Sequence, residues 1–395
     1  NRKKYSIKSL KKSFSISMNN IEYTAELFGC NYGGVEYIFI YSSLLCDREF
    51  LYGIPTEGYA DNALRFAIFC RVIVEILRDN TYDIVHLNDW QTALVPLLLQ
   101  EESLIKAKTL FTINNLAYQG LFAYEVLKEI GIDSKYFTTD VLEFYNKVNF
   151  MKAAIAYSDA ITTVSQSYAD EILTASFGCG LDGFLRYHKN KLTGIINGID
   201  NEHFTPSHDK LLEYPFANLT EKKLNKKSYL KEKSLKGITK PLFIFIGRFT
   251  QQKGVDLLIN SLEQIASSDC NIAILGDGEE IYQEKIMKIV NEYDNIHFEF
   301  KYNEVLSHQM YAAADFLLMP SLFEPRGLNQ MIAMSYGAIP IVHKVGGLKD
   351  TVHDYKLFDK ESNKAYGILF EDPSSDSLIY SFNEALALYS TKKDY

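Results

Sequence analysis

Short apolar runs alternate with helical segments along most of the chain. Each run spans four or five residues, is rich in β-branched or aromatic side chains, and precedes a turn and a stretch of helical period. Continuous apolar strands that alternate with helices are typical of parallel sheets covered on both faces. We therefore predict an α/β fold, with strands at residues Asp83–Leu87, Thr109–Ile113, Ala160–Val164, Leu242–Ile246, Ile272–Leu275, His297–Phe300, Phe316–Met319, Ile339–Val342 and Gly367–Phe370.

The opening stretch has a different pattern. Ser13–Met18 and Val35–Tyr41 alternate polar and apolar residues or gather aromatic ones, and Asn31-Tyr32-Gly33-Gly34 precedes the second of them. Turns rich in Asn and Gly between such runs favour a β-hairpin. We predict that this hairpin forms an antiparallel edge on the first parallel sheet.

The periodic pattern lapses between Pro206 and Pro241, where lysines crowd residues 222–236. This run fits either a patch for a polyanion or the solvated face of a helix, and the net charge of −9 favours the helix. A chain of 395 residues suits two or three domains. We predict two doubly wound, Rossmann-like domains, residues 1–193 and 194–395, that face each other across a cleft.

Composition narrows the class of protein. Apolar residues make up 47% of the chain and charged residues 23%, as in a packed globular protein. The negative charge argues against nucleic acid or an acidic membrane as a partner, and no apolar run reaches the roughly 18 residues of a membrane span. Five scattered cysteines give no disulfide framework and no C-x-x-C metal spacing, which favours a reducing cytoplasm. Because the chain begins with Asn1 and shows no signal-peptide pattern, we expect it to be part of a longer protein.

Polar residues gather directly after the predicted strands. In open parallel sheets ligands bind beyond the carboxyl ends of the strands, where loops and helix N-termini converge. Loops with this character come from both halves of the chain: Asn88–Gln91, Asn114–Gly120, Gly247–Gly254, Pro320–Leu328 and Lys344–Leu348.

The loops of the second half suggest anion binding. Arg248 offers a planar fork of donors and Lys253 a compact ammonium, both after one strand. Gly346-Gly347 opens a predicted helix at residues 348–354, where backbone N–H groups and the helix dipole favour a phosphate. A single Arg–Lys pair often only forms salt bridges on the surface. Arg248, Lys253 and the Gly346-Gly347 helix start together favour a diphosphate site.

The sequence context does not support other phosphate-binding or metal-binding motifs. Gly178-Cys179-Gly180-Leu181-Asp182-Gly183 fits G-x-G-x-x-G, yet it follows a helical segment at residues 168–174 instead of a strand. Gly276-Asp277-Gly278 follows a strand but has Ile281 at the third glycine position. No P-loop is present, and the eight histidines show no paired metal spacing. We therefore expect no metal and no bound cofactor.

Taken in order, a series of motifs resembles one family, the bacterial glycogen synthases and plant starch synthases. These are ADP-glucose-dependent glucosyltransferases with the two-domain GT-B fold. The resemblance covers essentially the whole chain and lies in Tyr59–Phe66, His86–Trp90, Thr112–Gly120, Ile161–Ser165, Gly180–Gly183, Asn197–Asp200, Gln252–Gly254, Phe323–Leu328 and Gly346–Val352.

The resemblance implies roles for residues of the second half. Arg248 and Lys253 match the cations that hold the ADP diphosphate and stabilise its developing charge. Glu324 matches the carboxylate that orients the donor glucose. The remaining positions match donor contacts: Gly327 and Leu328 through their backbone, Tyr302 against adenine, and Gly346 and Gly347 around the distal phosphate.

In the first half the resemblance implies a glucosyl pocket. Asp61 and Asn88 match positions that line it, as does Asn197 just beyond the domain boundary, and Asn114, Tyr118 and Gln119 lie in the loop facing donor and acceptor. Simpler interpretations remain open for three residues. Asp61 suits a helix cap, Asn197-Gly198 is an ordinary turn signal, and Tyr302 is one of 27 tyrosines.

The chain departs from the family pattern at several points. The Lys-x-Gly-Gly-Leu donor loop is absent and would precede Asn1, and the family's C-terminal helix is missing after Tyr395. Asn88 and Asn114 stand where many bacterial members have histidines; asparagine hydrogen-bonds a sugar but carries no proton at neutral pH. Arg326 replaces a common cysteine.

The resemblance implies a retaining transferase that moves glucose from ADP-glucose to the non-reducing end of an α-1,4-glucan. The expected partners are ADP-glucose and glycogen, starch or maltodextrin, in the cytoplasm or, in a plant, the plastid. One alternative is a GT-B transferase for another nucleotide sugar. Many of those carry a second glutamate that would fall at position 332, which is Ile332 here. The other alternative is a glucan-binding fragment without catalysis.

Overall fold

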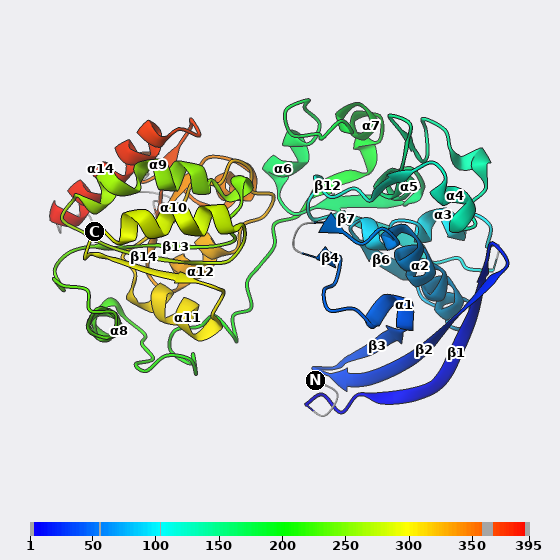
Figure 1. Ribbon diagram of the computed structural model, residues 1–395, viewed down its shortest axis with the longest axis horizontal. Coiled ribbons are helices and arrows are strands. Elements are labelled where there is room, and N and C mark those ends of the chain that lie inside the picture. The colour runs from blue at the N-terminus through cyan, green and yellow to red at the C-terminus, as the bar shows by residue number, and fades with distance from the viewer. Residues whose placement is uncertain (1–3, 55–56, 103, 358–365, 392–395) are drawn as a thin grey trace. The chain divides into compact units, whose positions relative to one another are not determined.

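The computed structural model describes residues 4–54, 57–102, 104–357 and 366–391 (Figure 1). The chain divides into two compact units. The first unit holds Asn1–Thr163 and Ala169–Thr193, and the second holds Val164–Tyr168 and Gly194–Tyr395. The start of the long second stretch at Gly194 coincides with the predicted domain boundary, whereas residues 164–168 lie in the second unit although they precede that boundary. None of the helices in the described part of the chain combines the length and apolar character that crossing a bilayer demands.

The second unit is built on a six-stranded sheet in the order β15-β14-β13-β16-β17-β18. Every neighbouring pair in this sheet is parallel. The chain starts at a central strand, winds outward to one edge and then returns to build the other, which is the order of a Rossmann fold. The strands are β13 (Leu242–Ile246), β14 (Asn271–Gly276), β15 (Ile296–Phe300), β16 (Phe316–Met319), β17 (Ile339–His343) and β18 (Ile368–Phe370).

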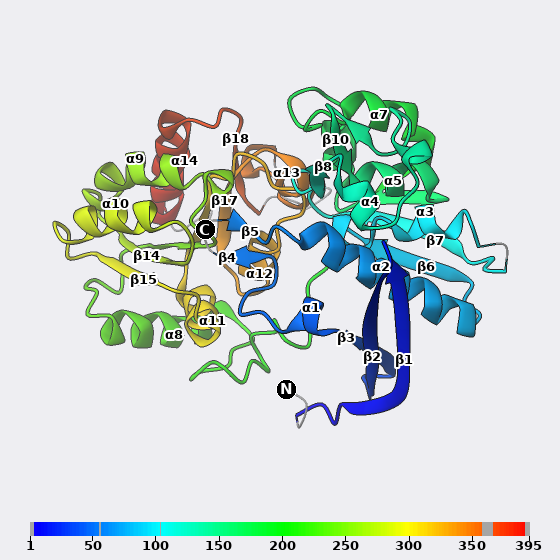
Figure 2. The ribbon, with the colours of Figure 1, turned by 45° about the vertical axis from the view of Figure 1, so that its right-hand side comes forward.

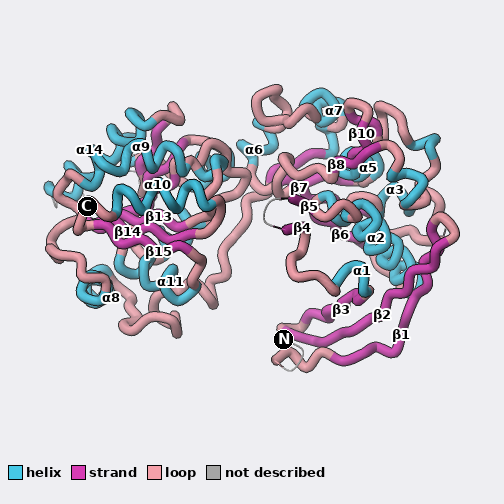
Figure 3. The backbone as a smooth tube through the Cα atoms, in the orientation of Figure 1, coloured by secondary structure: helices cyan, strands magenta, loops and turns pink. Residues whose placement is uncertain are grey.

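Helices cover both faces of this sheet (Figure 3). Phe243 and Phe245 of β13 point toward one face, where they join a core with side chains such as Leu258, Ile286 and Phe382. Because β13 is buried along its whole length, both of its alternating side-chain faces are apolar. The helices of the unit are α8 (Leu219–Glu232), α9 (Val255–Ala266), α10 (Glu280–Val290), α11 (Glu304–Ala313), α12 (Asn329–Ser335), α13 (Gly346–Thr351) and α14 (Ser375–Thr391), with α6 (Gln166–Glu171) shared between the two units.

The first unit contains a four-stranded sheet in the order β12-β11-β7-β6, in which β6, β7 and β11 run parallel. Two small sheets, β8-β10-β9 and β4-β5, accompany it. The strands are β4 (Gly53–Ile54), β5 (Glu57–Gly58), β6 (Ile84–Asn88), β7 (Lys108–Ile113), β8 (Leu121–Ala123), β9 (Glu143–Phe144), β10 (Lys147–Asn149), β11 (Ala160–Thr163) and β12 (Leu192–Gly194). The helices are α1 (Ser43–Cys46), α2 (Asn62–Asp79), α3 (Val95–Leu99), α4 (Val126–Glu129), α5 (Phe150–Tyr157) and α7 (Asp182–Tyr187).

A hairpin turn is present at Gly33 and Gly34, but the strands and their place in the fold differ from the prediction. The predicted runs Ser13–Met18 and Val35–Tyr41 do not pair with each other, because each pairs with the strand Ile21–Tyr32 that lies between them. Strands β2 (Ile21–Tyr32) and β3 (Val35–Tyr41) pair antiparallel around Gly33 and Gly34, which both have positive φ angles as a tight hairpin turn requires. Together with β1 (Lys8–Met18) they form a sheet of their own and not an edge of the parallel sheet. The reason is packing: Ile16, Met18, Ala25 and Leu27 lie against apolar side chains of α2, so this sheet covers a helix (Figure 2).

All nine strands predicted from apolar runs are confirmed, with bounds that differ by at most one residue. The predicted helix at residues 348–354 is α13, which begins at Gly346 and ends at Thr351. The helical segment expected at residues 168–174 is α6, which begins and ends earlier. Hydrophobic periodicity therefore located the elements well, and helix ends less well.

The lysine-rich stretch does form a helix, α8, but the interpretation of its lysines as a solvated face is wrong for two of them. Lys222 and Lys226 are each only 5% exposed. Lys222 Nζ donates hydrogen bonds to the carbonyl oxygens of Tyr311 and Tyr336, at 3.3 and 2.6 Å. Lys226 Nζ lies 2.5 Å from Asp315 Oδ2. Their long stems cross apolar surface while their ammonium groups tie α8 to the rest of the unit.

We expect Lys222 to make stability depend on pH. Burial lowers the pKa of Lys222 to about 7, so between pH 7 and 10 the folded state holds fewer protons than the unfolded state, and the free energy of unfolding rises with pH. Between pH 7 and 9 the free energy of unfolding of the wild type should rise by about 2 kcal/mol more than that of Lys222→Met, as measured by urea unfolding. The exposed Lys227→Met is the control and should follow the wild-type profile. If the free energies of unfolding of wild type and Lys222→Met changed with pH in the same way, the prediction that the buried Lys222 amine becomes neutral in the folded protein would be contradicted.

Candidate active site

The predicted anion site lies at the carboxyl ends of β13 and β16, the adjacent central strands from which the chain winds in opposite directions. This point of a doubly wound sheet is where loops on the two sides diverge and leave room for a ligand. Arg248 follows β13, and Lys253 ends a short 3-10 helix, Gln251–Lys253, that leads into α9. Glu324 lies in the loop between β16 and α12.

Lys253 and Glu324 are brought together by this topology. Lys253 Nζ lies 2.5 Å from Glu324 Oε2, and the same carboxylate oxygen accepts a hydrogen bond from Ser321 Oγ at 3.1 Å. The Glu324 side chain is 5% exposed and that of Lys253 21%, so the pair sits in a recess with the ammonium on its open side. Only one of the three Lys253 donors is engaged by this carboxylate. The pair thus presents a fixed positive charge next to a carboxylate that can accept hydrogen bonds from hydroxyl groups.

Arg248 is exposed at the same end of the sheet. Within the described residues the structure gives its guanidinium no hydrogen bond and no ion pair. Its fork of donors is therefore uncommitted in the protein, as a group that binds a diphosphate should be.

Close backbone contacts fix the position of Lys253. Gly254 has a φ angle of +67°, and a Cβ atom there would lie 1.9 Å from the carbonyl oxygen of Pro320. The N–H of Leu322 also donates to the carbonyl oxygen of Gln252 at 2.9 Å. Only glycine permits the two loops to approach this closely, and that approach places the ammonium against the carboxylate.

Gly346 and Gly347 lie against the other side of the Glu324 loop. The N–H of Gly347 donates to the carbonyl oxygen of Glu324 at 2.9 Å, and a Cβ atom on Gly347 would lie 2.0 Å from the carbonyl oxygen of Arg326. Gly327, at a φ angle of +57°, completes the loop. The predicted phosphate loop and the predicted sugar-orienting loop are therefore one packed unit.

Several supporting residues of this unit were missed from the sequence. His343 holds the loop because its Nδ1 is 2.7 Å from the carbonyl oxygen of Ser321. Gln330 Nε2 donates to the carbonyl oxygen of Gly327 and to Thr351 Oγ1, both at 2.9 Å. Neither residue carries a signal in the sequence beyond its proximity to a motif.

The segment 164–168 adds further contacts within the second unit. Ser165 Oγ donates to the carbonyl oxygen of Pro325 at 2.8 Å. The N–H and the hydroxyl of Ser167 both donate to the carboxylate of Asp350, at 2.7 and 2.5 Å. The motif ending in Ser165 thus supports the Glu324 loop, a role that its spacing did not indicate.

The remaining predicted residues of the second unit have few contacts. Tyr302 is 56% exposed in the loop between β15 and α11, where a ring is accessible for stacking. Leu328 is half-buried at the start of α12. Asn197 is half-buried in a stretch without helix or strand, and within the described residues no hydrogen bond engages its side chain. Their assignment as substrate contacts stays a prediction.

In the first unit, Asn88 and Asn114 come together at the ends of β6 and β7. Asn114 Nδ2 donates to Asn88 Oδ1 and to Asp89 Oδ2, both at 3.2 Å. Asp89 also accepts from the backbone N–H of Asn114 at 2.9 Å and has a φ angle of +57°, unusual for a residue other than glycine. Asp89, which the sequence did not single out, therefore fixes the orientation of the two amides.

Asp61 stands at the N-cap position of α2, but its side chain makes no capping hydrogen bond, so the alternative interpretation as a helix cap is wrong. The carboxylate instead pairs with Arg48, and both side chains are 28% exposed. The Arg48 guanidinium in turn lies 4.8 Å from the centre of the Tyr59 ring. A partly exposed carboxylate held by an arginine remains able to accept a hydrogen bond from a sugar hydroxyl.

Tyr118 and Gln119 differ sharply in environment. Tyr118 is 54% exposed, whereas Gln119 is buried. Gln119 Nε2 donates to the carbonyl oxygen of Cys179 at 3.0 Å, and its Oε1 accepts from Asn149 Nδ2 at 2.6 Å. Both ends of the Gln119 amide are thus used to hold the loop, while its predicted contact with substrate stays a prediction.

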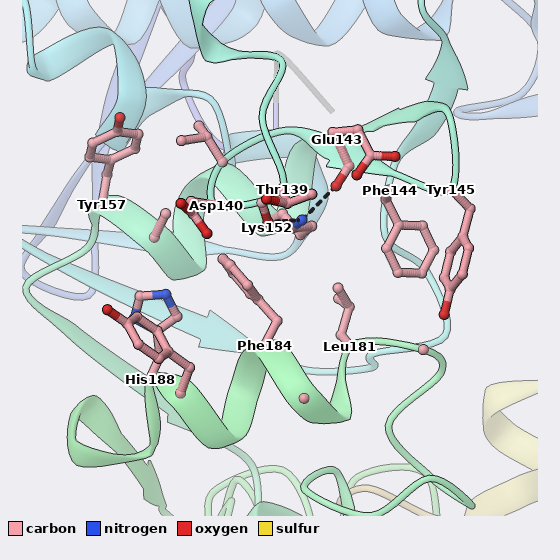
Figure 4. Close-up of a pocket in the computed structure, with 15 residues that line it drawn as sticks. Thr139, Asp140, Glu143, Phe144, Tyr145, Lys152, Tyr157, Leu181, Phe184 and His188 are labelled. Atoms are coloured by element: carbon pink, nitrogen blue, oxygen red, sulfur yellow. Dashed lines mark hydrogen bonds between the residues drawn. The ribbon is translucent and has the colours of Figure 1, made fainter.

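A separate pocket of about 790 Å³ lies within the first unit (Figure 4). Gly180, Leu181 and Gly183 of the rejected glycine motif form part of its wall. Lys152 also lines it; burial lowers the pKa of its ammonium, and Nζ donates to the carbonyl oxygens of Thr139 and Glu143 at 2.6 and 2.5 Å. None of the predicted site residues lines this pocket, so it is distinct from the candidate active site.

Two family models match most of the chain. Residues 1–187 match the starch synthase catalytic domain, and residues 226–395 match the group 1 glycosyl transferases. The chain is 42% identical over 388 residues to a glycogen synthase of Aquifex aeolicus, covering 97% of this chain and 81% of that protein. It is 37% identical over 400 residues to glycogen synthase 2 of Geobacter sulfurreducens, with coverages of 98% and 82%.

Solved structures give the same result. The catalytic domain of starch synthase IV from Arabidopsis thaliana, bound to ADP and acarbose, matches with a TM-score of 0.90 and 31% identity over 98% of this chain and 82% of that one. A sucrose-phosphate synthase from Thermosynechococcus elongatus matches with a TM-score of 0.60 at 17% identity over 92% of this chain and 77% of that one, which concerns the fold alone.

Fold and matches together define a two-domain α/β glycosyltransferase of the GT-B class, as the sequence predicted. The chain belongs to the family of glycogen synthases and starch synthases. It is a hexosyltransferase, with the function of a glycogen or starch synthase.

Proposed function

We propose that this chain transfers glucose from ADP-glucose to the non-reducing end of an α-1,4-glucan with retention of the anomeric configuration. The observation that carries the proposal is the Lys253–Glu324 pair at the carboxyl ends of the central strands of the second unit, the end of the sheet at which Arg248 also lies, uncommitted. The two cations can hold the diphosphate end of a sugar diphosphate, and the fixed carboxylate can hold the hydroxyl groups of its sugar end. The solved structure of a 31% identical starch synthase bound to ADP and acarbose supports both classes of ligand.

The proposed step needs no metal and no bound cofactor. The bond between glucose C1 and the diphosphate oxygen breaks while C1 bonds to the acceptor hydroxyl oxygen, and the hydroxyl proton passes to the departing diphosphate. Arg248 and Lys253 stabilise the charge that develops on that leaving group, since preorganised cations act most strongly where charge appears in the transition state. Glu324 orients the glucosyl hydroxyls, and in the first unit Asp61, Asn88 and Asn114 supply acceptors and donors for sugar.

The cysteines support the proposed compartment. Cys30, Cys46, Cys70, Cys179 and Cys270 are all free. Disulfides are rare in reducing compartments, so we propose the cytoplasm, or the plastid if the source is a plant.

A donor screen tests the proposal. Purified protein is incubated with glycogen or maltoheptaose and with ADP-, UDP- or GDP-glucose, and the elongated chains are quantified. We expect incorporation from ADP-glucose to exceed that from the other donors at least about tenfold, and the new linkages to be cleaved by an α-glucosidase. A preference for UDP- or GDP-glucose, β-linked products, or glucan binding without incorporation would each contradict it.

A further inference from the structure

Three side chains with metal-binding atoms meet at the start of α11 in the second unit. Glu304 and His308 are four residues apart and therefore share one face of the helix. His203 comes from the stretch that enters the second unit after Gly194. The ligand atoms of the three residues all lie within 4.8 Å of one another, and His203 Nε2 is 3.2 Å from Glu304 Oε1.

The buried member of the cluster is oriented by a buried carboxylate. His308 is 1% exposed, and its Nδ1 lies 2.7 Å from Asp209 Oδ2, which also accepts a hydrogen bond from the hydroxyl of Tyr336 at 2.5 Å. With Nδ1–H donating to a carboxylate, the lone pair of the imidazole resides on Nε2. Within the described residues no hydrogen bond engages Nε2. A carboxylate that fixes the tautomer and the ring of a histidine is the usual outer partner of a metal-binding imidazole.

The histidine of the loop is also held in place. Asp200 Oδ1 accepts hydrogen bonds from the backbone N–H groups of Glu202 and His203, at 2.8 and 3.2 Å. The next residue, Phe204, stacks on the ring of His308 with their centres 5.0 Å apart and their planes 20° from parallel. The loop therefore packs onto the helix beside the cluster, and His203 is presented by an ordered turn.

A simple surface ion pair does not account for this arrangement. His203 and Glu304 have side chains 44% and 58% exposed, and a pair so exposed contributes little to stability. Such a pair would need neither a third ligand group nor a buried carboxylate to orient it. Two imidazoles and one carboxylate are, in contrast, a common donor set for Zn²⁺, which takes a water molecule as its fourth ligand.

We propose that His203, Glu304 and His308, through its Nε2, form a binding site for Zn²⁺. The ion would join the stretch that enters the second unit to the first turn of α11. Helix α11 begins two residues after Tyr302, so the bound ion would also restrain the loop that carries this ring. The site stabilises the fold and takes no part in the transfer step, so its existence does not depend on the proposed donor.

Zinc titration of the chelator-treated, desalted protein tests the site. Wild type, His203→Ala, Glu304→Gln and the control His208→Ala are titrated with Zn²⁺ by calorimetry. His208 belongs to the same stretch but bonds to Ser207 Oγ and lies outside the cluster. We expect wild type and His208→Ala each to bind one equivalent of Zn²⁺ with the same affinity. His203→Ala and Glu304→Gln should either not bind this Zn²⁺ or bind it at least about tenfold more weakly, since even the loss of an outer residue of a metal site lowers affinity on that scale.

Thermal unfolding gives a second measurement. Because Zn²⁺ that binds only the folded state raises the unfolding temperature, added Zn²⁺ should stabilise wild type and His208→Ala but not His203→Ala. The exposed thiols of Cys46 and Cys179 are present in all four proteins and contribute equally. Identical isotherms for the four proteins, an equal loss in the control, or no saturable binding in the wild type would overturn the proposal.

Discussion

Replacement of Lys253 by alanine is expected to lower kcat at least about 100-fold. The ammonium is held in position before substrate arrives, and removal of one such preorganised group typically costs about 10²–10³ in rate. The substitution also leaves the Glu324 carboxylate, 5% exposed, without its countercharge. The measurement is the initial rate of glucose incorporation from saturating ADP-glucose into glycogen. Lys288→Ala, at an exposed position on α10, is the control and should stay within about twofold of wild type.

The partner of Lys253 provides an internal check. Glu324→Gln keeps the shape of the side chain and removes its charge, and we expect a loss of similar size. Residues that act as a unit have strongly non-additive effects, so the double variant Lys253→Ala/Glu324→Gln should be little slower than either single variant. A Lys253→Ala protein that is folded by circular dichroism and retains near-wild-type kcat would show that the site is misassigned.

The second large effect is expected for Gly347→Ala. The added Cβ atom would lie 2.0 Å from the carbonyl oxygen of Arg326, so α13 and the Glu324 loop must move apart and the hydrogen bond from Gly347 N–H to Glu324 is lost. Overpacking of this kind costs about 1–3 kcal/mol. We expect the unfolding temperature to fall and ADP to bind at least about tenfold more weakly, measured by denaturation and by calorimetry.

Gly198 offers a matched control for this variant. A Cβ atom on Gly198 would meet nothing within 4 Å, so Gly198→Ala should change neither the unfolding temperature nor ADP binding. Wild-type affinity for ADP in Gly347→Ala would separate the glycine loop from the donor site and contradict the assignment of Gly346 and Gly347.

The fold was largely readable because the strands of the second unit are buried on both faces. A run such as Leu242–Ile246 has no polar position at all, which leaves a central parallel strand as its natural interpretation. One error arose where the type of a side chain conflicts with its environment. Lys222 has the character of a solvated residue, and only the tertiary structure shows its ammonium against two carbonyl oxygens.

The sequence predicted only those contacts of the site that follow from the order of strands in the sheet. Lys253 and Glu324 are 71 residues apart, yet they follow neighbouring strands of one parallel sheet, so their proximity follows from the strand order. No such rule exists for Ser167 and Asp350, separated by 183 residues, or for Asp89, whose role depends on a left-handed backbone. His203 and His308 likewise lie too far apart in sequence for a spacing rule to connect them.

The segment 164–168 has a consequence for how the protein can be divided. The chain crosses from one unit to the other after Thr163, after Tyr168 and again after Thr193. The two units are therefore connected at three points and not by a single linker. Expression of residues 194–395 alone would discard Ser165 and Ser167, leaving Asp350 and the carbonyl oxygen of Pro325 without these donors. A fragment that begins at Gly194 therefore lacks five residues, 164–168, that belong to the second unit.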